Sequence, residues 1–371
     1  MTVQNPPNGT PKRICIQRLS HLGDVVHALP VFHALRARYP NAGIAWVVQP
    51  EFAGMLEGLP GLARVIPFER GGGLLAWWRL RRELRAFRAD LAVDCQGNWK
   101  SGLATRLTGA KRRVGLSRGE WREPHASWCC NELATAAVQA GGHSPHSVSR
   151  MLHLASYIGE QPIVADSFPH PSFSLLLNDA EREEGELQAR ERLASTFPVI
   201  LHLGAGHDPR SWGTSSFVEL ARMLASQGRS VLILSGPAEA QAGARVQAEL
   251  AGERGVSHWV GQRGLRQLAA FFQAAAKNGA RIVSADSGPM HLAWASGLPV
   301  SLLAGPQDAS VTGPWPLASA PGSPHETLAA DEVTFPCRPC LRRVCYEDRT
   351  ADIAPCMRSI TPADVLKTLV S

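Results

Sequence analysis

The sequence predicts an α/β protein with two domains, each built from parallel strands and the helices that connect them. Short apolar runs alternate with helical patterns, and this alternation starts again in the second half of the chain. The 371 residues suffice for two domains of about 150 to 200 residues each. We expect domains at 1–168 and 169–371, a proline-containing linker at 165–174, and a cleft between them for two substrates.

In the first half, the first buried strand ends in a polar turn that carries an acid. Strands are expected at 13–19, 44–49, 64–67 and 90–96, and helices at 25–39 and 74–88. The turn after the first strand contains Gly23 and Asp24. Open α/β sheets bind ligands at the carboxyl ends of their strands, so Asp24 is a candidate functional residue. Its alternative role is to cap the following helix.

In the second half, glycine turns follow several predicted strands. Strands are expected at 197–203, 230–235 and 282–283, with an apolar run following at 300–303, and helices at 217–227, after 265, from 289 and at 362–369. The turn at 204–206 precedes a polar loop with Arg210, and Glu239 comes shortly after the strand at 230–235.

The third of these turns, at 286–288, offers the best anion site. Pro289 is predicted as the first helical residue and Gly297 lies just past the helix end. The free N–H groups of such a helix, beside Ser287 and Gly288, suit a phosphate or a carboxylate. His291, one turn along, is expected to point back toward this site. The alternative is that Ser287 is an N-cap and His291 a surface residue with its hydrogen bonds satisfied.

Several classes of protein are poorly supported. The turn at 204–206 is not a full dinucleotide fingerprint and the sequence has no Walker motif, which argues against a nicotinamide dehydrogenase or a P-loop ATPase. The net charge of +6 favours an anionic partner, but the basic residues form no recognisable nucleic-acid module. With no secretory pattern and no apolar run of about 18 residues, the chain is expected to be cytoplasmic.

The helix predicted at 74–88 has one apolar stripe and several arginines beside it. At helical spacing the stripe contains Trp77, Leu80, Leu84 and Phe87, and the arginines off it are Arg79, Arg82 and Arg85. These arginines form a solvated face, or they receive an anionic acceptor or acidic lipid headgroups. Both interpretations are compatible.

Four cysteines lie close together near the C-terminus. Cys337, Cys340, Cys345 and Cys356 have the spacing C-x₂-C-x₄-C-x₁₀-C. Four thiolates in a reducing compartment suit a structural zinc or iron site. Reduced structural cysteines and a disulfide pair are the alternatives.

Three motifs together resemble the bacterial heptosyltransferases of glycosyltransferase family 9. They are Ser20-x-x-Gly-Asp24 followed by His27 and Pro30, Gly204-Ala-Gly206 with Arg210-x-Trp212, and Asp286-Ser-Gly-Pro-Met-His291 with Gly305-Pro306. The resemblance implies two Rossmann-like domains in a glycosyltransferase-B fold. It also implies an ADP-heptose donor, inversion at the anomeric carbon and no cofactor for catalysis.

The resemblance also assigns roles to particular residues. Asp24 would be the general base, and Arg210, where many members have Lys, would stabilise the departing diphosphate. The donor site would contain Gly204, Gly206, Glu239, Asp286, Ser287, Gly288 and His291.

The first half, through motifs beginning at Asp94 and Trp121, is most similar to the first heptosyltransferase of the lipopolysaccharide core. The acceptor would then be Kdo-lipid A or its heptosylated form, met at the cytoplasmic face of the inner membrane. Its contacts would be Lys100, Arg122, Arg79 and Arg82. The cysteine-rich tail is more similar to the second heptosyltransferase. Two other functions stay open: heptosyl transfer to a protein, and a non-catalytic nucleotide-sugar-binding assembly module.

Overall fold

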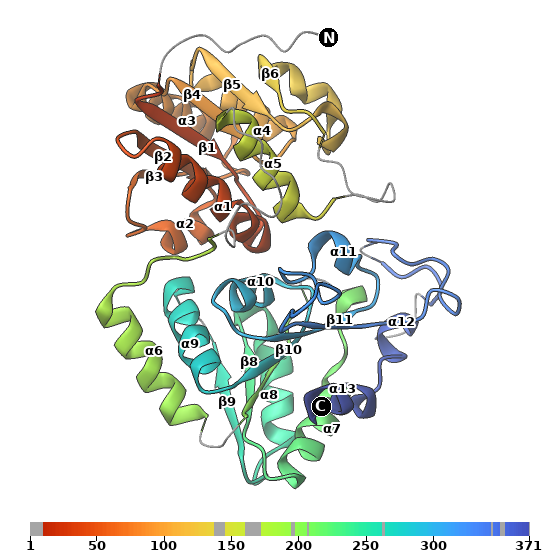
Figure 1. Cartoon of the computed structure of the whole chain (residues 1–371). Coiled ribbons are helices and arrows are strands. Elements are labelled where there is room, and N and C mark those ends of the chain that lie inside the picture. The colour runs from red at the N-terminus through yellow and green to blue at the C-terminus, as the bar shows by residue number, and fades with distance from the viewer. Residues whose placement is uncertain are drawn as a thin grey trace. The chain divides into compact units, whose positions relative to one another are not determined.

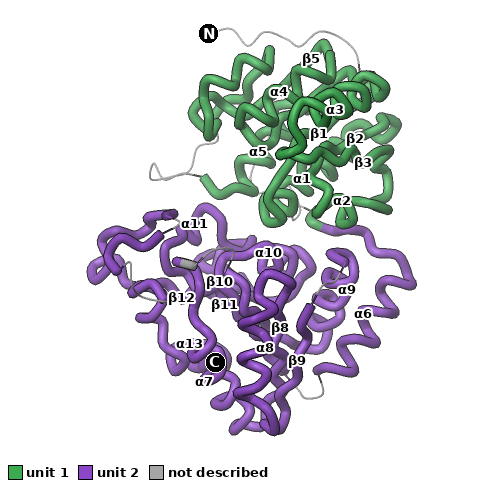
Figure 2. The backbone as a smooth tube through the Cα atoms, turned by 180° about the vertical axis from the view of Figure 1, so that it is seen from behind, with its two compact units in different colours: residues 1–173 green, residues 174–371 purple. Residues whose placement is uncertain are grey.

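The structure is a computed structural model that describes residues 10–136, 145–159, 172–193, 197–205, 208–261, 264–342, 344–348 and 353–370. The chain divides into two compact units, residues 1–173 and residues 174–371 (Figure 2). Most of the predicted linker lies outside the described residues, and the predicted division at 168 and 169 stays a prediction.

Unit 1 contains one fully parallel sheet of six strands in the order β3-β2-β1-β4-β5-β6 (Figure 1). This is the Rossmann strand order, in which the direction of winding reverses between β1 and β4. The strands are β1 (Arg13–Gln17), β2 (Gly43–Val48), β3 (Leu62–Pro67), β4 (Leu91–Asp94), β5 (Arg112–Gly115) and β6 (Glu132–Leu133).

Helices cover both faces of this sheet. The helices are α1 (Leu22–Arg38), α2 (Pro50–Leu56), α3 (Gly73–Phe87), α4 (Trp99–Leu107) and α5 (Ser147–Gly159), with short 3₁₀ turns η1 (Arg118–Glu120) and η2 (Pro124–Cys129). One core cluster joins alternate strand residues such as Ala45 and Ala92 to Leu80 and Leu84 of α3 and to Ala104 of α4. The apolar stripe predicted for α3 is therefore confirmed as its buried side, and α1 packs against α5 elsewhere in the unit.

Unit 2 repeats the same topology. Its sheet has the order β12-β11-β10-β7-β8-β9, again fully parallel, with the reversal between β7 and β10. The strands are β7 (Val199–His202), β8 (Val231–Ser235), β9 (Val256–Val260), β10 (Arg281–Ala285), β11 (Val300–Ala304) and β12 (Glu326–Ala329).

The helices of unit 2 pack on this sheet and on one another. They are α6 (Asp179–Arg192), α7 (Thr214–Ser226), α8 (Ala240–Glu249), α9 (Leu265–Lys277), α10 (Gly288–Ala295), α11 (Ala309–Thr312), α12 (Pro355–Arg358) and α13 (Pro362–Val370), with 3₁₀ turns η3 (Asp208–Arg210) and η4 (Pro237–Glu239). One core cluster contains Leu201, Ile233 and Val283 of the sheet together with residues of α7, α8 and α13. Separately, α9 packs along α6 and against α10. Among the described residues, no helix combines the length and the apolar character needed to span a bilayer.

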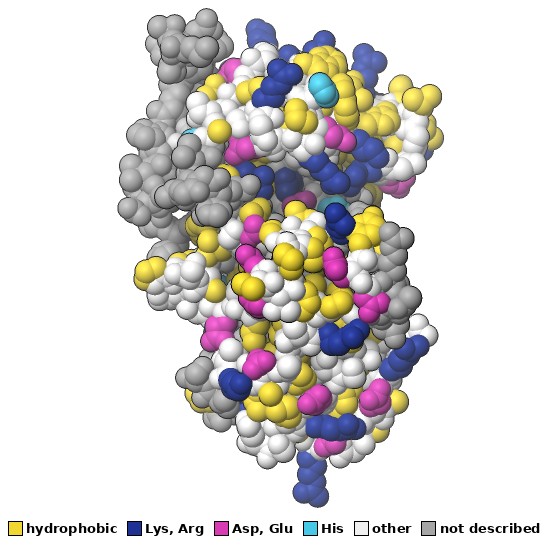
Figure 3. Space-filling view, turned by 90° about the vertical axis from the view of Figure 1, so that its right-hand side faces the viewer, with side chains coloured by type: hydrophobic (Ala, Val, Ile, Leu, Met, Phe, Trp, Pro, Cys, Tyr) yellow, Lys and Arg dark blue, Asp and Glu magenta, His cyan; other side chains and the backbone are white. Residues whose placement is uncertain are grey.

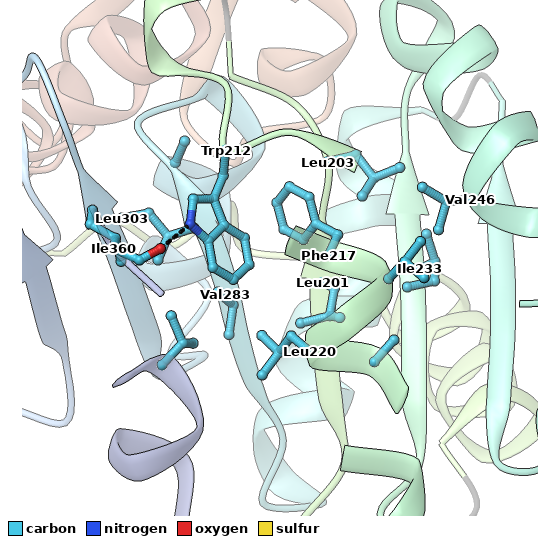
Figure 4. Packing of buried hydrophobic residues seen from close by; sticks show 14 of the residues in the cluster. Leu201, Leu203, Trp212, Phe217, Leu220, Ile233, Val246, Val283, Leu303 and Ile360 are labelled. Atoms are coloured by element: carbon cyan, nitrogen blue, oxygen red, sulfur yellow. Dashed lines mark hydrogen bonds between the residues drawn. The ribbon is translucent and has the colours of Figure 1, made fainter. Parts of the chain in front are cut away.

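Trp212 lies in the middle of the unit 2 core. It is 1% exposed and its ring meets that of Phe217 edge to face, with centroids 5.0 Å apart. Its indole Nε1 donates a 2.7 Å hydrogen bond to the carbonyl of Ile360 (Figure 4). The indole thus joins the loop before α7 to the C-terminal segment, and it fixes the main chain two residues after Arg210.

His325, just before β12, makes the stability of unit 2 depend on pH. Its Nδ1 accepts the N–H of Val300 (3.2 Å), and its Nε2 lies 3.3 Å from the carbonyl of Trp315. Burial lowers the pKa of His325 from 6.5 to about 4. As pH falls from 6.5 toward 4, the unfolded chain gains a proton at His325 that the folded chain excludes. Stability is therefore complete above pH 6.5, and we expect a loss of about 2 kcal/mol between pH 7 and pH 5.

The measurement is urea unfolding at both pH values, with His325→Gln as the comparison. Glutamine has no proton to gain in this range, so the variant should lose about 2 kcal/mol less than the wild type over the same interval. Equal losses in the two proteins would show that His325 is not the group responsible.

Candidate active site

Asp24 lies in the first turn of α1, whereas the sequence analysis placed it in the turn before this helix. The helix begins at Leu22, earlier than predicted, because the Asp24 carboxylate accepts the backbone N–H of His21 (3.1 Å) in a capping box. The other carboxylate oxygen lies 2.6 Å from a guanidinium nitrogen of Arg18. The Asp24 side chain is nevertheless 38% exposed. Capping therefore leaves lone pairs of the carboxylate open to a ligand.

Arg18 holds Asp24 through contacts on both sides of the switch between β1 and β4. Its Nε donates to the carbonyl of Asp24 (3.1 Å), and its Nη1 donates to the carbonyl of Cys95, just after β4. Its side chain is only 10% exposed. Arg150 on α5 lies within electrostatic range of both Arg18 and Asp24, and burial lowers the pKa of Arg150. Two guanidinium groups therefore lie near the Asp24 carboxylate, and that of Arg18 is in direct contact with it.

A hydrogen-bond network around Ser20 joins the ends of four neighbouring strands. The Ser20 hydroxyl accepts from Arg70 (2.5 Å) and from the amide of Gln96 (3.4 Å). Arg70, three residues after β3, also donates to Gln49 (2.9 Å), and Gln96 accepts the N–H of Leu19 (2.6 Å). These side chains gather at the carboxyl edge of the sheet, where a Rossmann-like domain binds its ligand.

Asp94 fixes the loop that carries Gln96. It is fully buried, and its carboxylate accepts the N–H groups of Gln96 and Gly97 (both 2.9 Å). Burial raises the pKa of Asp94, while these two N–H groups and nearby hydroxyls oppose that shift. Asp94 therefore acts as an internal support of the loop after β4, and Gln96 is the residue of this motif that faces the Ser20 network.

Of the four predicted acceptor residues, Lys100 is the one that hydrogen-bonds to this network within the described part of the chain. Its Nζ donates to the carbonyl of Arg70 (3.0 Å). Arg122 is exposed beside Glu123, whose carboxylate accepts the N–H of Trp99 at the start of α4. Arg79 and Arg82 are exposed on α3, and within the described residues no hydrogen bond or ion pair joins them to the Asp24 group.

In unit 2, the predicted donor residues follow strands that are neighbours in the sheet. Gly204 follows β7, Glu239 ends the turn after β8, and Asp286 follows β10. A Cβ at Gly204 would lie 2.6 Å from the His202 ring and 3.0 Å from the Glu239 carboxylate, so only glycine allows this approach. The Glu239 carboxylate also accepts the N–H of Gly236 (3.0 Å). Gly206, a predicted donor contact, lies outside the described residues.

Arg210 and Asp286 form a partly buried ion pair. An Arg210 Nη lies 3.2 Å from the Asp286 carboxylate and donates to the Asp286 carbonyl at the same distance. The Arg210 side chain remains 24% exposed, and its buried Nε has no hydrogen-bond partner among the described residues. The guanidinium is therefore fixed on one side and has donors left for an anion on the other.

His291 points back toward the turn at 286–288, and it is buried rather than a surface residue. It is 5% exposed; its Nε2 lies 3.0 Å from the Asp286 carboxylate and its Nδ1 accepts the indole N–H of Trp294 (3.2 Å). Because Nδ1 accepts, Nε2 carries the proton that bonds Asp286. His291 thus holds one oxygen of the Asp286 carboxylate, and Arg210 holds the other.

Ser287 is the N-cap of α10, as one of the two interpretations predicted. Its hydroxyl accepts the N–H of Met290 (3.4 Å), and Gly288 rather than Pro289 is the first helical residue. His202 of β7 lies beneath this turn, with Nδ1 3.3 Å from the Ser287 hydroxyl and 3.0 Å from that of Ser284. The N–H groups at the start of α10 lie beside the Arg210 and Asp286 pair, which concentrates positive potential there.

The four C-terminal cysteines are not arranged as a metal site. All eight cysteines of the chain are free thiols, and no group of three or more Cys, His, Asp or Glu is placed to hold a metal ion in the part of the chain that the structure describes. Burial raises the pKa of the Cys356 thiol, and Cys340, Cys345 and Cys337 add smaller contributions. Cys356 and Met357 pack against Gly305, so this thiol belongs to the unit 2 core.

Comparison with known proteins identifies the family. The model of glycosyltransferase family 9 (heptosyltransferase) matches residues 77–349, which is most of the chain. The chain belongs to glycosyltransferase family 9. It is a glycosyltransferase of the heptosyltransferase type, as the sequence motifs predicted.

Relatives of this family 9 chain cover nearly its full length. It is 29% identical to lipopolysaccharide heptosyltransferase 1 of Pseudomonas aeruginosa over 92% of the chain and 89% of that protein. Its structure resembles that of E. coli ADP-heptose LPS heptosyltransferase II, with a TM-score of 0.70, 24% identity and coverage of 96% and 97%. It also resembles E. coli heptosyltransferase WaaC with ADP, with a TM-score of 0.67, 21% identity and coverage of 96% and 97%. These likenesses confirm the predicted glycosyltransferase-B fold.

Proposed function

We propose that this family 9 enzyme transfers heptose from ADP-L-glycero-D-manno-heptose to the Kdo and heptose inner core of lipopolysaccharide. The observation that carries the proposal is the half-exposed Asp24 carboxylate held by Arg18 at the switch point of unit 1. The names of its relatives support the donor and the acceptor: one is a lipopolysaccharide heptosyltransferase, one carries ADP-heptose in its name, and one holds ADP.

In the proposed reaction, Asp24 takes the proton from an acceptor hydroxyl as that oxygen attacks the anomeric carbon of the heptose. The new C–O bond forms while the bond from the anomeric carbon to the diphosphate breaks, and ADP leaves with that bonding pair. Attack from the side opposite the leaving group inverts the anomeric centre. One base is enough because no covalent sugar intermediate forms.

The departing diphosphate gains negative charge, and unit 2 supplies donors for it. Arg210 has unused N–H groups, and the start of α10 at Ser287 and Gly288 offers backbone N–H groups and the positive end of the helix dipole. Glu239, beside Gly204, is placed to accept ribose hydroxyls. No described residue is required to hold a metal for this chemistry.

The acceptor side is assigned to the carboxyl edge of unit 1. Arg70 and Lys100 lie around the Ser20 network, and Arg122 precedes Glu123, whose carboxylate accepts the N–H of Trp99 at the start of α4. Carboxylates of Kdo or phosphates of lipid A are the anions that such groups bind. An acceptor anchored in lipid also implies that the enzyme works peripherally at the cytoplasmic face of the inner membrane.

The test is a mass-spectrometric assay of purified protein with ADP-heptose and Kdo-lipid A. The proposal predicts that the acceptor gains the mass of one heptose and that ADP is released in equal amount. If only heptosylated Kdo-lipid A gains mass, the second addition is the reaction. If neither acceptor gains mass although ADP-heptose binds, the proposed acceptor is wrong.

A further inference from the structure

The large hydrophobic side chains that are exposed in unit 1, as far as the structure describes it, lie on three elements. Within the described part of unit 1, the large apolar side chains that are exposed all belong to α3, α4 and η2. They are Leu74 (89%), Leu75 (57%), Trp78 (56%), Trp99 (46%), Leu103 (38%) and Trp128 (54%). We call these six residues the α3–α4 apolar surface. Single exposed hydrophobic residues are normal, but six on adjoining elements indicate an interaction surface.

The three elements adjoin one another. α3 contacts α4, and α4 contacts η2. The ring centroids of Trp99 and Trp128 are 6.2 Å apart, and Leu103 lies one helical turn after Trp99. The start of each helix follows the carboxyl end of a strand, so Leu74, Leu75 and Trp99 lie at the sheet edge that carries the Ser20 network. This surface is therefore next to the proposed acceptor site.

Arginines surround the apolar side chains. α3 contains four arginines and one acid, Glu83, which pairs with Arg64 (2.9 Å), while α4 contains Lys100 and Arg106 and no acid. The guanidinium of Arg82 lies 5.1 Å from the ring centroid of Trp78, and that of Arg106 lies 4.9 Å from that of Trp128. Figure 3 shows one face of the molecule, on which hydrophobic and basic side chains of unit 1 both reach the surface; it labels no residue of the α3–α4 apolar surface.

A hollow on α3 is suited to an anionic group. It is shallow and open to solvent, and it is lined by Trp78, Arg81, Arg82 and Arg85. An indole wall with three guanidinium groups can hold a phosphate while the apolar part of the ligand meets the tryptophan.

We propose that the α3–α4 apolar surface docks on an anionic lipid bilayer. Tryptophans and leucines would enter the headgroup region, and the arginines would bind lipid phosphates, as in interfacial amphipathic helices. A protein partner would not need this excess of positive charge around exposed indoles. The inference extends the proposed function, since docking here would bring a lipid-anchored acceptor to the edge of the unit 1 sheet.

The experiment is flotation of the full-length protein with phosphatidylcholine vesicles that contain or lack phosphatidylglycerol. We expect binding to the anionic vesicles only, with affinity that falls as salt rises. The apolar variant Leu74→Ser, Leu75→Ser, Trp78→Ser should bind about tenfold more weakly. The charge variant Arg81→Gln, Arg85→Gln, Arg106→Gln should bind on the order of a hundredfold more weakly. These arginines are not among the proposed acceptor contacts.

A matched control replaces exposed apolar residues of unit 2, Leu187→Ser and Val333→Ser, and should bind as the wild type does. Vesicle binding that is absent in the wild type, or equal in all four proteins, would overturn the docking proposal. So would an apolar variant that changes from dimer to monomer in solution, because a second copy would then cover this surface.

The proposed reaction can fail independently. With Kdo-lipid A dispersed in detergent, both surface variants should transfer heptose at the wild-type rate, and with Kdo-lipid A in vesicles they should be slower. A wild-type protein that binds anionic vesicles but transfers no heptose in detergent would refute the reaction and leave the docking surface intact. Slower transfer in detergent by either variant would place these residues in the acceptor site and overturn the docking role.

Discussion

Replacing Asp24 by Asn is expected to lower kcat about a thousandfold, without loss of donor binding. Asparagine is nearly the same size, and its carbonyl can still accept the N–H of His21, so α1 keeps its first turn. It cannot take a proton from the acceptor hydroxyl, and general base catalysis contributes about 10² to 10⁴ in rate. The measurements are heptose transfer by mass spectrometry and ADP-heptose affinity by calorimetry.

Asp90→Asn is the matched control. The Asp90 carboxylate also accepts backbone N–H groups, from Lys12 and Arg13 (both 2.9 Å), but it lies at the opposite edge of the same sheet. This variant should retain wild-type kcat even if its melting temperature falls. A Asp24→Asn protein with more than a tenth of wild-type kcat would exclude Asp24 as the base, and would leave it as a helix cap.

The strands of both sheets follow from sequence patterns wherever they are buried on both faces. β1, β4, β7 and β10 are continuous apolar runs that end in polar turns, and each was predicted near its observed position. β5, β6, β9 and β12 were not predicted, because these strands are only partly buried and mix polar with apolar residues; β6, β9 and β12 also lie at sheet edges. The beginning of α1 was misplaced because His21 and Asp24 cap it together, and histidine is a weak signal for a cap.

The candidate site was predicted less completely than the fold. Asp24, Arg210 and Asp286 follow strands, so their place at a carboxyl edge could be read from the sequence. Their partners could not, because the contacts join distant segments. Arg18 bonds Cys95, and Arg70 bonds Ser20, only because β3, β1 and β4 become close neighbours in the sheet. Arg18 and Arg70 each stand just after a strand, which was a usable signal.

For His291 and the C-terminal cysteines, residue type and spacing in the sequence did not determine which contacts the side chains make. A histidine one turn into a helix was expected to point back toward the turn at 286–288, and its Nε2 does reach Asp286 there. Its Nδ1 accepts the indole N–H of Trp294, a contact that the sequence did not indicate. The cysteine spacing suggested four thiolates around a metal. Cys356 instead packs with Met357 against Gly305. In both cases tertiary packing decides the role, and spacing in the sequence does not contain that information.

Replacing Arg210 by Gln is expected to lower kcat about a hundredfold and to weaken ADP binding about tenfold. Removing a donor that stabilises charge in the transition state costs about 10² to 10³ in rate. The change also leaves the buried Asp286 carboxylate with His291 as its remaining side-chain partner among the contacts described above. Arg210→Lys keeps the charge but loses the planar pair of donors, so its kcat should lie between those of Arg210→Gln and the wild type.

The distinguishing measurement compares ADP with AMP. If Arg210 binds the diphosphate, Arg210→Gln should weaken ADP binding much more than AMP binding, since AMP lacks the phosphate that is bonded to the heptose in ADP-heptose. A purely structural role through Asp286 would weaken both nucleotides alike. Arg222→Gln, which removes an exposed arginine paired with Glu253 (3.3 Å) on α7, controls for the loss of one positive charge from unit 2. Because Trp212 holds the main chain beside Arg210 independently of the guanidinium, the loop should keep its position in Arg210→Gln, and the two outcomes can be told apart.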